Sequence, residues 1–395
     1  MSLKRRQFLI FGGMAVGASL ATLSQEVFRA DKTSDRSATT AANLIIPQVN
    51  GQSKNNVFTI GREIAPKGLF APARGDVRIV VISDLNSQYG STSYEAEVVQ
   101  AIALAPGWQP DLVLCSGDMV AGQSPSLSQS QIKAMWAAFD KTIGAPLRKA
   151  KLPYGFTVGN HDASSAVGAN ARYLFAQERV LAKAHWQAPQ HDPGLNFVDR
   201  ADFPFNYTFE QNNIFYLVWD ASSAQITSKQ LTWVEKSLAS PTAQAAKMRI
   251  VIGHLPLYAV AVGRDEAGEF LVNAEKLRSR LEHHRVHTYI SGHHHAYFPA
   301  HRGQLQLLHT GALGAGARPL LNSNLSPQKT LTVIDINLSS ATTVYTTYNM
   351  TTLKLVNQLA LPRIIVGPNG SVLRRDVEWN DLTPAERSLT YVPSS

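Results

Sequence analysis

Carboxylate, amide and imidazole side chains follow five separate apolar runs in this sequence. The five polar clusters, in chain order, are Asp84-Leu85-Asn86, Gly117-Asp118, Gly159-Asn160-His161-Asp162, Gly253-His254 and Gly292-His293-His294-His295. Each apolar run has the length and composition of a buried β-strand, and polar clusters at the exits of separate strands can gather around one site. Oxygen and imidazole donors without any thiolate suit two divalent first-row metal ions better than a structural zinc ion.

The order of these clusters resembles the motif pattern of the calcineurin-like metallophosphoesterase superfamily. That pattern is D-x-H, G-D, G-N-H-D/E, a lone H after a strand, and G-H-x-H, and the resemblance extends over about residues 76–350. The purple acid phosphatase branch also has an H-x-P-x-Y stretch, which is similar to His254-Leu255-Pro256-Leu257-Tyr258. One cluster alone would be weak evidence, whereas five clusters in the same order are strong evidence for the resemblance.

The resemblance implies a dinuclear centre in which one carboxylate, that of Asp118, touches both metal ions and fixes their spacing. The expected ligands of the first ion are Asp84, Asn86, Asp118 and His295. The expected ligands of the second ion are Asp118, Asn160, His254 and His293. Two such ions, of manganese, iron, zinc or a similar metal, would bind the phosphate oxygens, lower the pKa of a bound water and stabilise the leaving oxygen.

The third cluster also contains two residues to which the resemblance assigns a catalytic role. His161 would face the substrate, donate a hydrogen bond to a phosphate oxygen and protonate the leaving group. Asp162 would hold the imidazole of His161 in the required tautomer.

Two positions depart from the family pattern. Asn86 stands where the first motif of the family has a histidine, and Ala121 stands where the purple acid phosphatase motif has a tyrosine. The first metal ion is therefore expected to be held more weakly, or to be bound by Asn86 through its side-chain carbonyl oxygen.

Each candidate ligand also has a structural explanation that needs no metal. Asp84 and Asp118 could cap strand ends or form turns, and Asn160 could occupy a left-handed turn. His254 could be a hydrogen-bonded core histidine, and the last cluster could be solvated surface. In an extended segment His294 points opposite to its neighbours, so we expect it at the substrate or the surface rather than on a metal ion.

Strand and helix patterns alternate from Val77 onward, which indicates an α/β domain. The resemblance adds the expectation of four layers in the order α/β/β/α, with two packed mixed β-sheets flanked by helices. We expect an export signal, a linker or N-terminal arm, the metallophosphoesterase catalytic domain and a C-terminal tail at residues 1–30, 31–75, 76–350 and 351–395. A long insertion, residues 163–206, follows the third cluster and is expected to present substrate contacts.

The first residues have the composition of an export signal. Three basic residues at positions 4–6 precede an apolar stretch that runs to about Leu23 and ends in small residues. The paired arginines are followed by Gln-Phe-Leu, which resembles a twin-arginine signal. We therefore expect a periplasmic or extracellular protein, with an uncleaved membrane anchor as the alternative.

Composition narrows the possible functions further. The 395-residue chain has a net charge of +8, but its positive residues are scattered, which disfavours nucleic-acid binding as the main role. Its one cysteine, Cys115, excludes an internal disulfide. We expect metal-dependent hydrolysis of phosphate mono- or diesters, with the phosphate ester as partner and membrane contact only through the export signal. The alternatives are a degenerate or single-metal member acting as a binding protein, and a nuclease.

Overall fold

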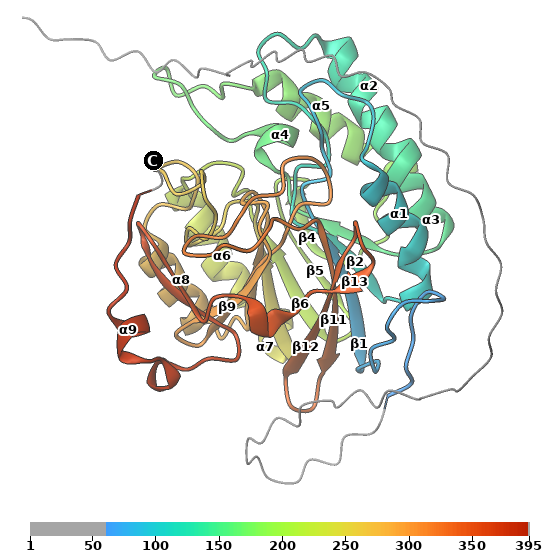
Figure 1. Ribbon diagram of the computed structural model, residues 1–395. Coiled ribbons are helices and arrows are strands. Elements are labelled where there is room, and N and C mark those ends of the chain that lie inside the picture. Colours follow the sequence, from blue (N-terminus) through green and yellow to red (C-terminus); the bar gives the residue numbers. More distant parts are fainter. Residues whose placement is uncertain (1–60, 394–395) are drawn as a thin grey trace, which may run out of the picture. The chain divides into compact units, whose positions relative to one another are not determined.

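The computed structural model describes residues 61–393, and the elements in Figure 1 belong to that part of the chain. The predicted export signal and most of the predicted linker, residues 1–60, lie outside the described residues. Within residues 61–393, no helix is both long and apolar enough to span a membrane.

The first three polar clusters follow strands of a six-stranded mixed sheet with the order β13-β12-β11-β1-β2-β3. Its strands are β1 (Val77–Ile82), β2 (Leu112–Cys115), β3 (Tyr154–Phe156), β11 (Thr330–Asn337), β12 (Thr342–Asn349) and β13 (Lys354–Leu355). Strands β1, β2 and β3 run parallel, so their carboxyl ends lie along one edge of the sheet. Both β1 and β2 are buried throughout, as their continuous apolar sequences require.

The last two clusters follow strands of a nine-stranded mixed sheet with the order β14-β15-β9-β10-β8-β7-β6-β5-β4. Its strands are β4 (Phe197–Asp202), β5 (Asn206–Gln211), β6 (Ile214–Val218), β7 (Met248–Ile252), β8 (Thr288–Ser291), β9 (Phe298–Arg302), β10 (Leu305–His309), β14 (Ile364–Gly367) and β15 (Gly370–Arg374). Strands β6, β7, β8 and β10 are parallel. Their carboxyl ends again share one edge.

Helices flank the paired sheets (Figure 1). On one side are α1 (Ala96–Leu104), α2 (Gln129–Phe139), α3 (Ala145–Lys149) and α5 (Ala176–Gln187), and on the other are α6 (Ser228–Leu238) and α8 (Ala274–His283). Helix α6 contacts β6, and α8 contacts β10. The short helices are α4 (Asn160–Ala163), α7 (Pro241–Ala245) and α9 (Pro384–Arg387). The insertion at residues 163–206 supplies α5 and β4, and α5 packs against α2.

The two sheets pack directly on one another. A Cβ atom on Gly155 of β3 would lie 3.0 Å from the ring of Phe209 in β5, so the glycine permits this close approach. The Phe156 N–H group donates to the Tyr207 hydroxyl at 3.1 Å, and that hydroxyl donates to the Phe156 carbonyl. The expected four-layer α/β/β/α fold is confirmed.

Part of the predicted tail, residues 351–395, pairs with both sheets. Strand β13 extends the six-stranded sheet beside β12, and the β14–β15 hairpin pairs with β9 at an edge of the nine-stranded sheet. This pairing covers strand edges that would otherwise be open.

Candidate metal centre

Side chains from the two sheets meet at one place, and each sheet supplies a different type of donor. The six-stranded sheet contributes oxygen donors, which are Asp84 after β1, Asp118 after β2 and Asn160 after β3. The nine-stranded sheet contributes imidazoles, which are His254 after β7 and His293 and His295 after β8. Loops beyond the carboxyl ends of parallel strands are the usual location of ligand sites in α/β folds.

Asp118, His254 and His293 form one group of potential metal ligands, here termed the His254 group. One donor atom from each residue lies within 4.8 Å of the others, and all three residues are buried. The Nε2 atom of His254 lies 3.3 Å from Asp118 Oδ2 and 2.9 Å from Asn160 Oδ1. The Nδ1 atom of His293 also lies 2.9 Å from Asn160 Oδ1, so this amide oxygen faces both rings.

Asp84, Asp118 and His295 form a second group with the same spacing of donor atoms, here termed the Asp84 group. The Nε2 atom of His295 lies 3.2 Å from Asp84 Oδ1. Asp118 belongs to both groups. Its carboxylate is therefore placed where one residue could contact two ions.

Asn86 is buried beside the Asp84 group, with 6% of its surface exposed. Its N–H group donates to the Asp118 carbonyl at 3.2 Å, and its carbonyl accepts from Ala315 N–H at 3.0 Å. A Cβ atom on Gly314 would lie 2.2 Å from the Asn86 carbonyl oxygen, so only glycine allows this packing. A glycine-rich loop after β10 thus fixes the backbone of the first cluster.

Four of the candidate ligands have left-handed backbone conformations, which non-glycine residues rarely adopt. Their φ angles are 49° for Asp84, 55° for Asp118, 65° for His293 and 54° for His295. Each marks a sharp change of direction just beyond a strand. Strained positions of this kind cluster at functional sites, where the surrounding structure holds them.

In each candidate histidine ligand, one ring nitrogen bonds to an oxygen outside the ligand groups. These contacts join His254 Nδ1 to the Ser116 carbonyl at 2.8 Å, His295 Nδ1 to the Gly316 carbonyl at 3.0 Å, and His293 Nε2 to Glu269 Oε2 at 2.8 Å. The other nitrogen of each ring faces the carboxylate and amide oxygens. This is the arrangement that fixes the tautomer and orientation of metal-binding histidines.

Glu269, which the sequence analysis did not identify, contacts the centre from the segment between β7 and α8. Its carboxylate pairs with His293 and also with Arg264 Nη1 at 2.6 Å. Its backbone carbonyl accepts a hydrogen bond from His294 Nε2 at 3.0 Å, while His294 Nδ1 accepts from Val260 N–H at 3.3 Å. The expectation that His294 would lie at the substrate or the surface is therefore wrong, because both its nitrogens are bonded inside the core.

A second set of supporting residues comes from the insertion. Glu178 of α5 accepts hydrogen bonds from the Gln123 N–H group at 3.0 Å. The Gln123 side-chain oxygen accepts from Asn160 Nδ2 at 2.6 Å, which orients the amide oxygen of Asn160 toward the two histidines. Sequence offers little signal for this contact, because Gln123 and Glu178 belong to no local motif and meet only in the folded chain.

His161 lies at the rim of the centre, but Asp162 does not orient it as expected. The Asp162 carboxylate instead accepts backbone N–H groups of Met119, Val120 and Gly159 at 2.8–2.9 Å. Nδ1–H of His161 donates to the Gly122 carbonyl at 3.0 Å, so a backbone group selects its tautomer. Asp162 occupies the third helical position of α4, and its carboxylate accepts the N–H group of Gly159 at the N-cap of that helix. This local hydrogen bond replaces the expected contact with His161.

The buried charges interact strongly. Burial raises the pKa of the Asp118 carboxyl, but the neighbouring His254 and His161 rings lower it below its usual range. Burial lowers the pKa of His254, but Asp118 raises it to about 9. Burial lowers the pKa of His293 to about 4. Near neutral pH without metal, His254 is therefore protonated and His293 is neutral, so an ion must displace the His254 proton.

Comparisons with known proteins concern the family and the fold. A family model described as calcineurin-like phosphoesterase matches residues 77–297. The structure of purple acid phosphatase PPD1 from seeds of yellow lupin (Lupinus luteus) is similar with a TM-score of 0.51 and 16% identity, covering 82% of this chain and 59% of that chain. A dimetal phosphatase from Danio rerio gives a TM-score of 0.44 and 13% identity, covering 67% of this chain and 93% of that chain. No curated protein matches the sequence.

At this identity the lupin structure supports the fold alone. This chain spans 59% of the length of the lupin protein, so the two are alike over one part of the larger molecule. The family match covers more than half of the 395 residues and includes all five polar clusters. The protein belongs to the calcineurin-like phosphoesterase family.

Proposed function

We propose that the protein is a metal-dependent hydrolase of phosphate mono- or diesters with a dinuclear metal centre. The observation that carries this proposal is the presence of Asp118 in both ligand groups. Two ions a few ångströms apart need one ligand that touches both, and a buried carboxylate with its two oxygens in contact with different neighbours can do so.

The residues present fit such a centre. Asp84, Asp118, His295 and Asn86 would hold one ion, and Asp118, Asn160, His254 and His293 would hold the other. All of these side chains except that of His295 are buried, and none is a thiolate. Such mixed oxygen and imidazole donors suit manganese, iron or zinc.

The chain's own residues would position the phosphate ester for attack. Bound ions would supply charge stabilisation at the phosphate oxygens and a water of lowered pKa. The backbone N–H group of His161 donates to Asp118 Oδ1 at 2.9 Å, and its ring Nε2 lies 4.0 Å from Asp118 Oδ2. Because Nδ1–H is donated to Gly122, the ring can donate a proton to a leaving oxygen only from Nε2, as an imidazolium ion.

A single-ion form of the same enzyme is the second candidate, and Asn86 favours it. An amide oxygen is a weaker donor than the imidazole that the family motif has at this position. In that form the His254 group would keep its ion, and the Asp84 group would be filled only at high metal concentration.

We also propose that the protein acts outside the cytoplasmic membrane, because residues 1–30 have the composition of an export signal. N-terminal sequencing of protein isolated from the periplasm or medium tests this. A mature chain that begins after about residue 25 supports export, and an intact Met1 in the cytoplasmic fraction contradicts it.

The hydrolase proposal is tested with protein prepared in metal-rich medium. We expect near two equivalents of bound metal, hydrolysis of 4-nitrophenyl phosphate, loss of activity on chelation and recovery with Mn²⁺. One equivalent with retained activity supports the single-ion form. Full activity after complete chelation, or no bound metal in active protein, rules out the proposed mechanism.

A further inference from the structure

Two arginines, Arg264 and Arg318, lie side by side at the edge of the candidate metal centre. Arg264 belongs to the segment between β7 and α8, and Arg318 belongs to the loop between β10 and β11. The Arg318 Nη1 atom lies 3.4 Å from the Val262 carbonyl, to which it donates. It would also lie 2.9 Å from a Cβ atom on Gly263. The Arg318 guanidinium therefore rests on the backbone that immediately precedes Arg264.

Each arginine is connected to one histidine of the last cluster. Arg264 Nη1 donates to Glu269 Oε2 at 2.6 Å, and the same oxygen atom lies 2.8 Å from His293 Nε2. The Arg318 backbone N–H group donates to the His295 carbonyl at 3.0 Å. The side chain of Arg264 and the backbone of Arg318 are thus each joined to one ligand group.

The two guanidinium groups differ in their ion pairing. Glu269 is the ion-pair partner of Arg264, whereas Arg318 forms no ion pair with any residue between 61 and 393. Burial and the nearby Arg264 lower the pKa of Arg318, whereas the Glu269 carboxylate raises it. In both side chains the Nε atom is buried and has no hydrogen-bond partner among the described residues. Buried donors of this kind are normally satisfied, and an anion would satisfy these.

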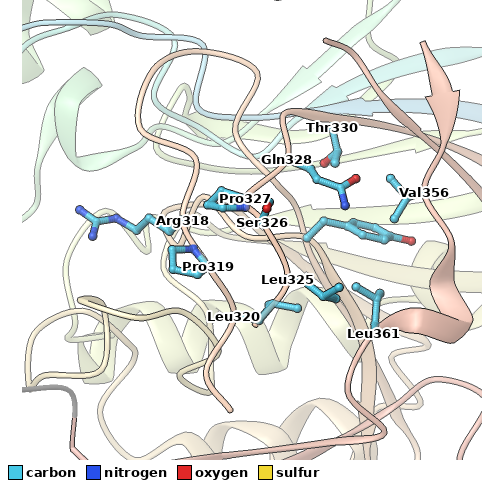
Figure 2. A pocket seen from close by; sticks show the side chains of 11 residues that line it. Arg318, Pro319, Leu320, Leu325, Ser326, Pro327, Gln328, Thr330, Val356 and Leu361 are labelled. Atoms are coloured by element: carbon cyan, nitrogen blue, oxygen red, sulfur yellow. The ribbon is translucent and has the colours of Figure 1, made fainter. Parts of the chain in front are cut away.

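The Arg318 side chain is not used to fill the nearby cavity. That cavity has a volume of about 30 Å³ and is lined largely by residues of the 318–330 loop. Figure 2 shows the guanidinium group of Arg318 extending away from the other lining side chains. The guanidinium group lies beside the backbone of Val262 and Gly263 instead.

We propose that Arg264 and Arg318 form an anion-binding subsite beside the metal centre, which selects phosphate esters that carry a second anionic group. This inference rests on the proposed phosphoesterase function and specifies its substrate class. The reacting phosphate would lie at the two ligand groups, and a carboxylate or second phosphate elsewhere on the molecule would pair with the guanidinium groups. Arginine suits this role because its planar fork binds both kinds of oxyanion in a bidentate manner.

The test compares two esters that differ by one carboxylate, phenyl phosphate and 4-carboxyphenyl phosphate. We expect the Arg318→Gln variant to lose about tenfold or more in kcat/KM on the carboxylated ester and less than about threefold on phenyl phosphate. Arg318→Lys keeps the charge and should retain an intermediate preference. Arg62→Gln is the matched control, because Arg62 is exposed and precedes β1, at the end of that strand opposite to Asp84.

Equal losses on both esters, or no loss on either, overturn the subsite while leaving the hydrolase proposal intact. If the wild-type protein cleaves neither ester, the monoester part of the proposed function fails, and calorimetry with the Mn²⁺-loaded protein still decides the subsite. Phenylphosphonate and 4-carboxyphenylphosphonate are the uncleavable probes for that measurement. A preference for the carboxylated probe that disappears in Arg318→Gln supports the subsite, and equal affinities in the wild-type protein contradict it.

Discussion

The His254 group and the Asp84 group share Asp118 but differ in the number and support of their other donors. The His254 group has two imidazoles and the oriented amide of Asn160, and Glu269 and Gln123 hold these donors from outside. The Asp84 group has one imidazole, and Asn86 stands where the family motif has a second. The two halves of one centre can therefore differ in metal affinity, even though the same carboxylate joins them.

The two groups also differ in the contacts that support their donors from outside. The donors of the His254 group are tied to α5 through Glu178 and to the loop before α8 through Glu269. The Asp84 group is held mainly by backbone contacts with the glycine-rich loop after β10, such as Gly314 N–H to the Asp84 carbonyl at 2.8 Å. We expect the His254 group to bind its ion more tightly.

Removing the shared ligand should prevent metal binding at both groups. In Asp118→Asn both groups lose their common carboxylate, so we expect loss of both ions and a fall in kcat on the order of 10³-fold. Metal analysis and 4-nitrophenyl phosphate hydrolysis measure the two effects. Asp192→Asn, in an exposed loop, is the matched control. Retention of two ions by Asp118→Asn would show that Asp118 does not bridge.

Removing the hydrogen-bond partner of His293 should weaken metal binding at the His254 group only. Glu269→Ala frees the His293 ring, and loss of such a partner typically reduces metal affinity about 10- to 100-fold. Glu266→Ala, an exposed glutamate of the same loop, is expected to bind metal as the wild-type protein does. Calorimetric Mn²⁺ titration should show that only the tighter of two binding events is changed. Equal weakening of both events would mean that Glu269 acts on the whole fold.

Restoring the family histidine should reduce the difference in metal affinity between the two groups. Asn86→His adds an imidazole to the Asp84 group, and we expect about tenfold tighter binding of the weaker ion. The same titration measures this change, with the wild-type protein as reference. Unchanged affinity would indicate that position 86 does not face the ion.

The pH dependence of metal binding should also distinguish the His254 group from the Asp84 group. The pKa of His254 is raised to about 9 in the metal-free protein, so binding at neutral pH must release its proton. Affinity at the His254 group should therefore rise with pH, by about threefold for each half unit between pH 7 and pH 8, and level off near pH 9. His293, with a pKa near 4, is already neutral and adds nothing to this slope.

Titrations in two buffers of different ionisation enthalpy count the released proton. The His254→Gln variant should release none at this step. Binding that is independent of pH in the wild-type protein would contradict the protonated state of His254.

The sequence predicted the strands that deliver the ligands because their signal is local. The continuous apolar runs that precede Asp84 and Gly117 are the strands Val77–Ile82 and Leu112–Cys115. The resemblance to an ordered set of motifs then indicated that Asp84, Asp118 and the histidines would converge, and the structure brings these side chains together. The metal-binding role of each residue stays a prediction.

Long-range contacts were not predictable from one sequence. Glu269 lies 24 residues before His293 in the chain, and Glu178 lies 55 residues after Gln123, so no periodic pattern connects either pair. The expected role of Asp162 was wrong for the opposite reason, because a local contact prevailed. The family resemblance paired it with His161, but an acidic side chain at the start of a helix binds nearby backbone N–H groups more readily.

Because the oxygen donors and the imidazoles come from different sheets, an ion held between them would cross-link the two sheets. Sliding of one sheet over the other would then require a metal–ligand bond to break. Loading with metal should consequently raise the unfolding temperature of the entire domain and make it melt in a single step, since the ion binds the folded chain far better than the unfolded one. Catalysis and mechanical integrity would depend on the same few bonds.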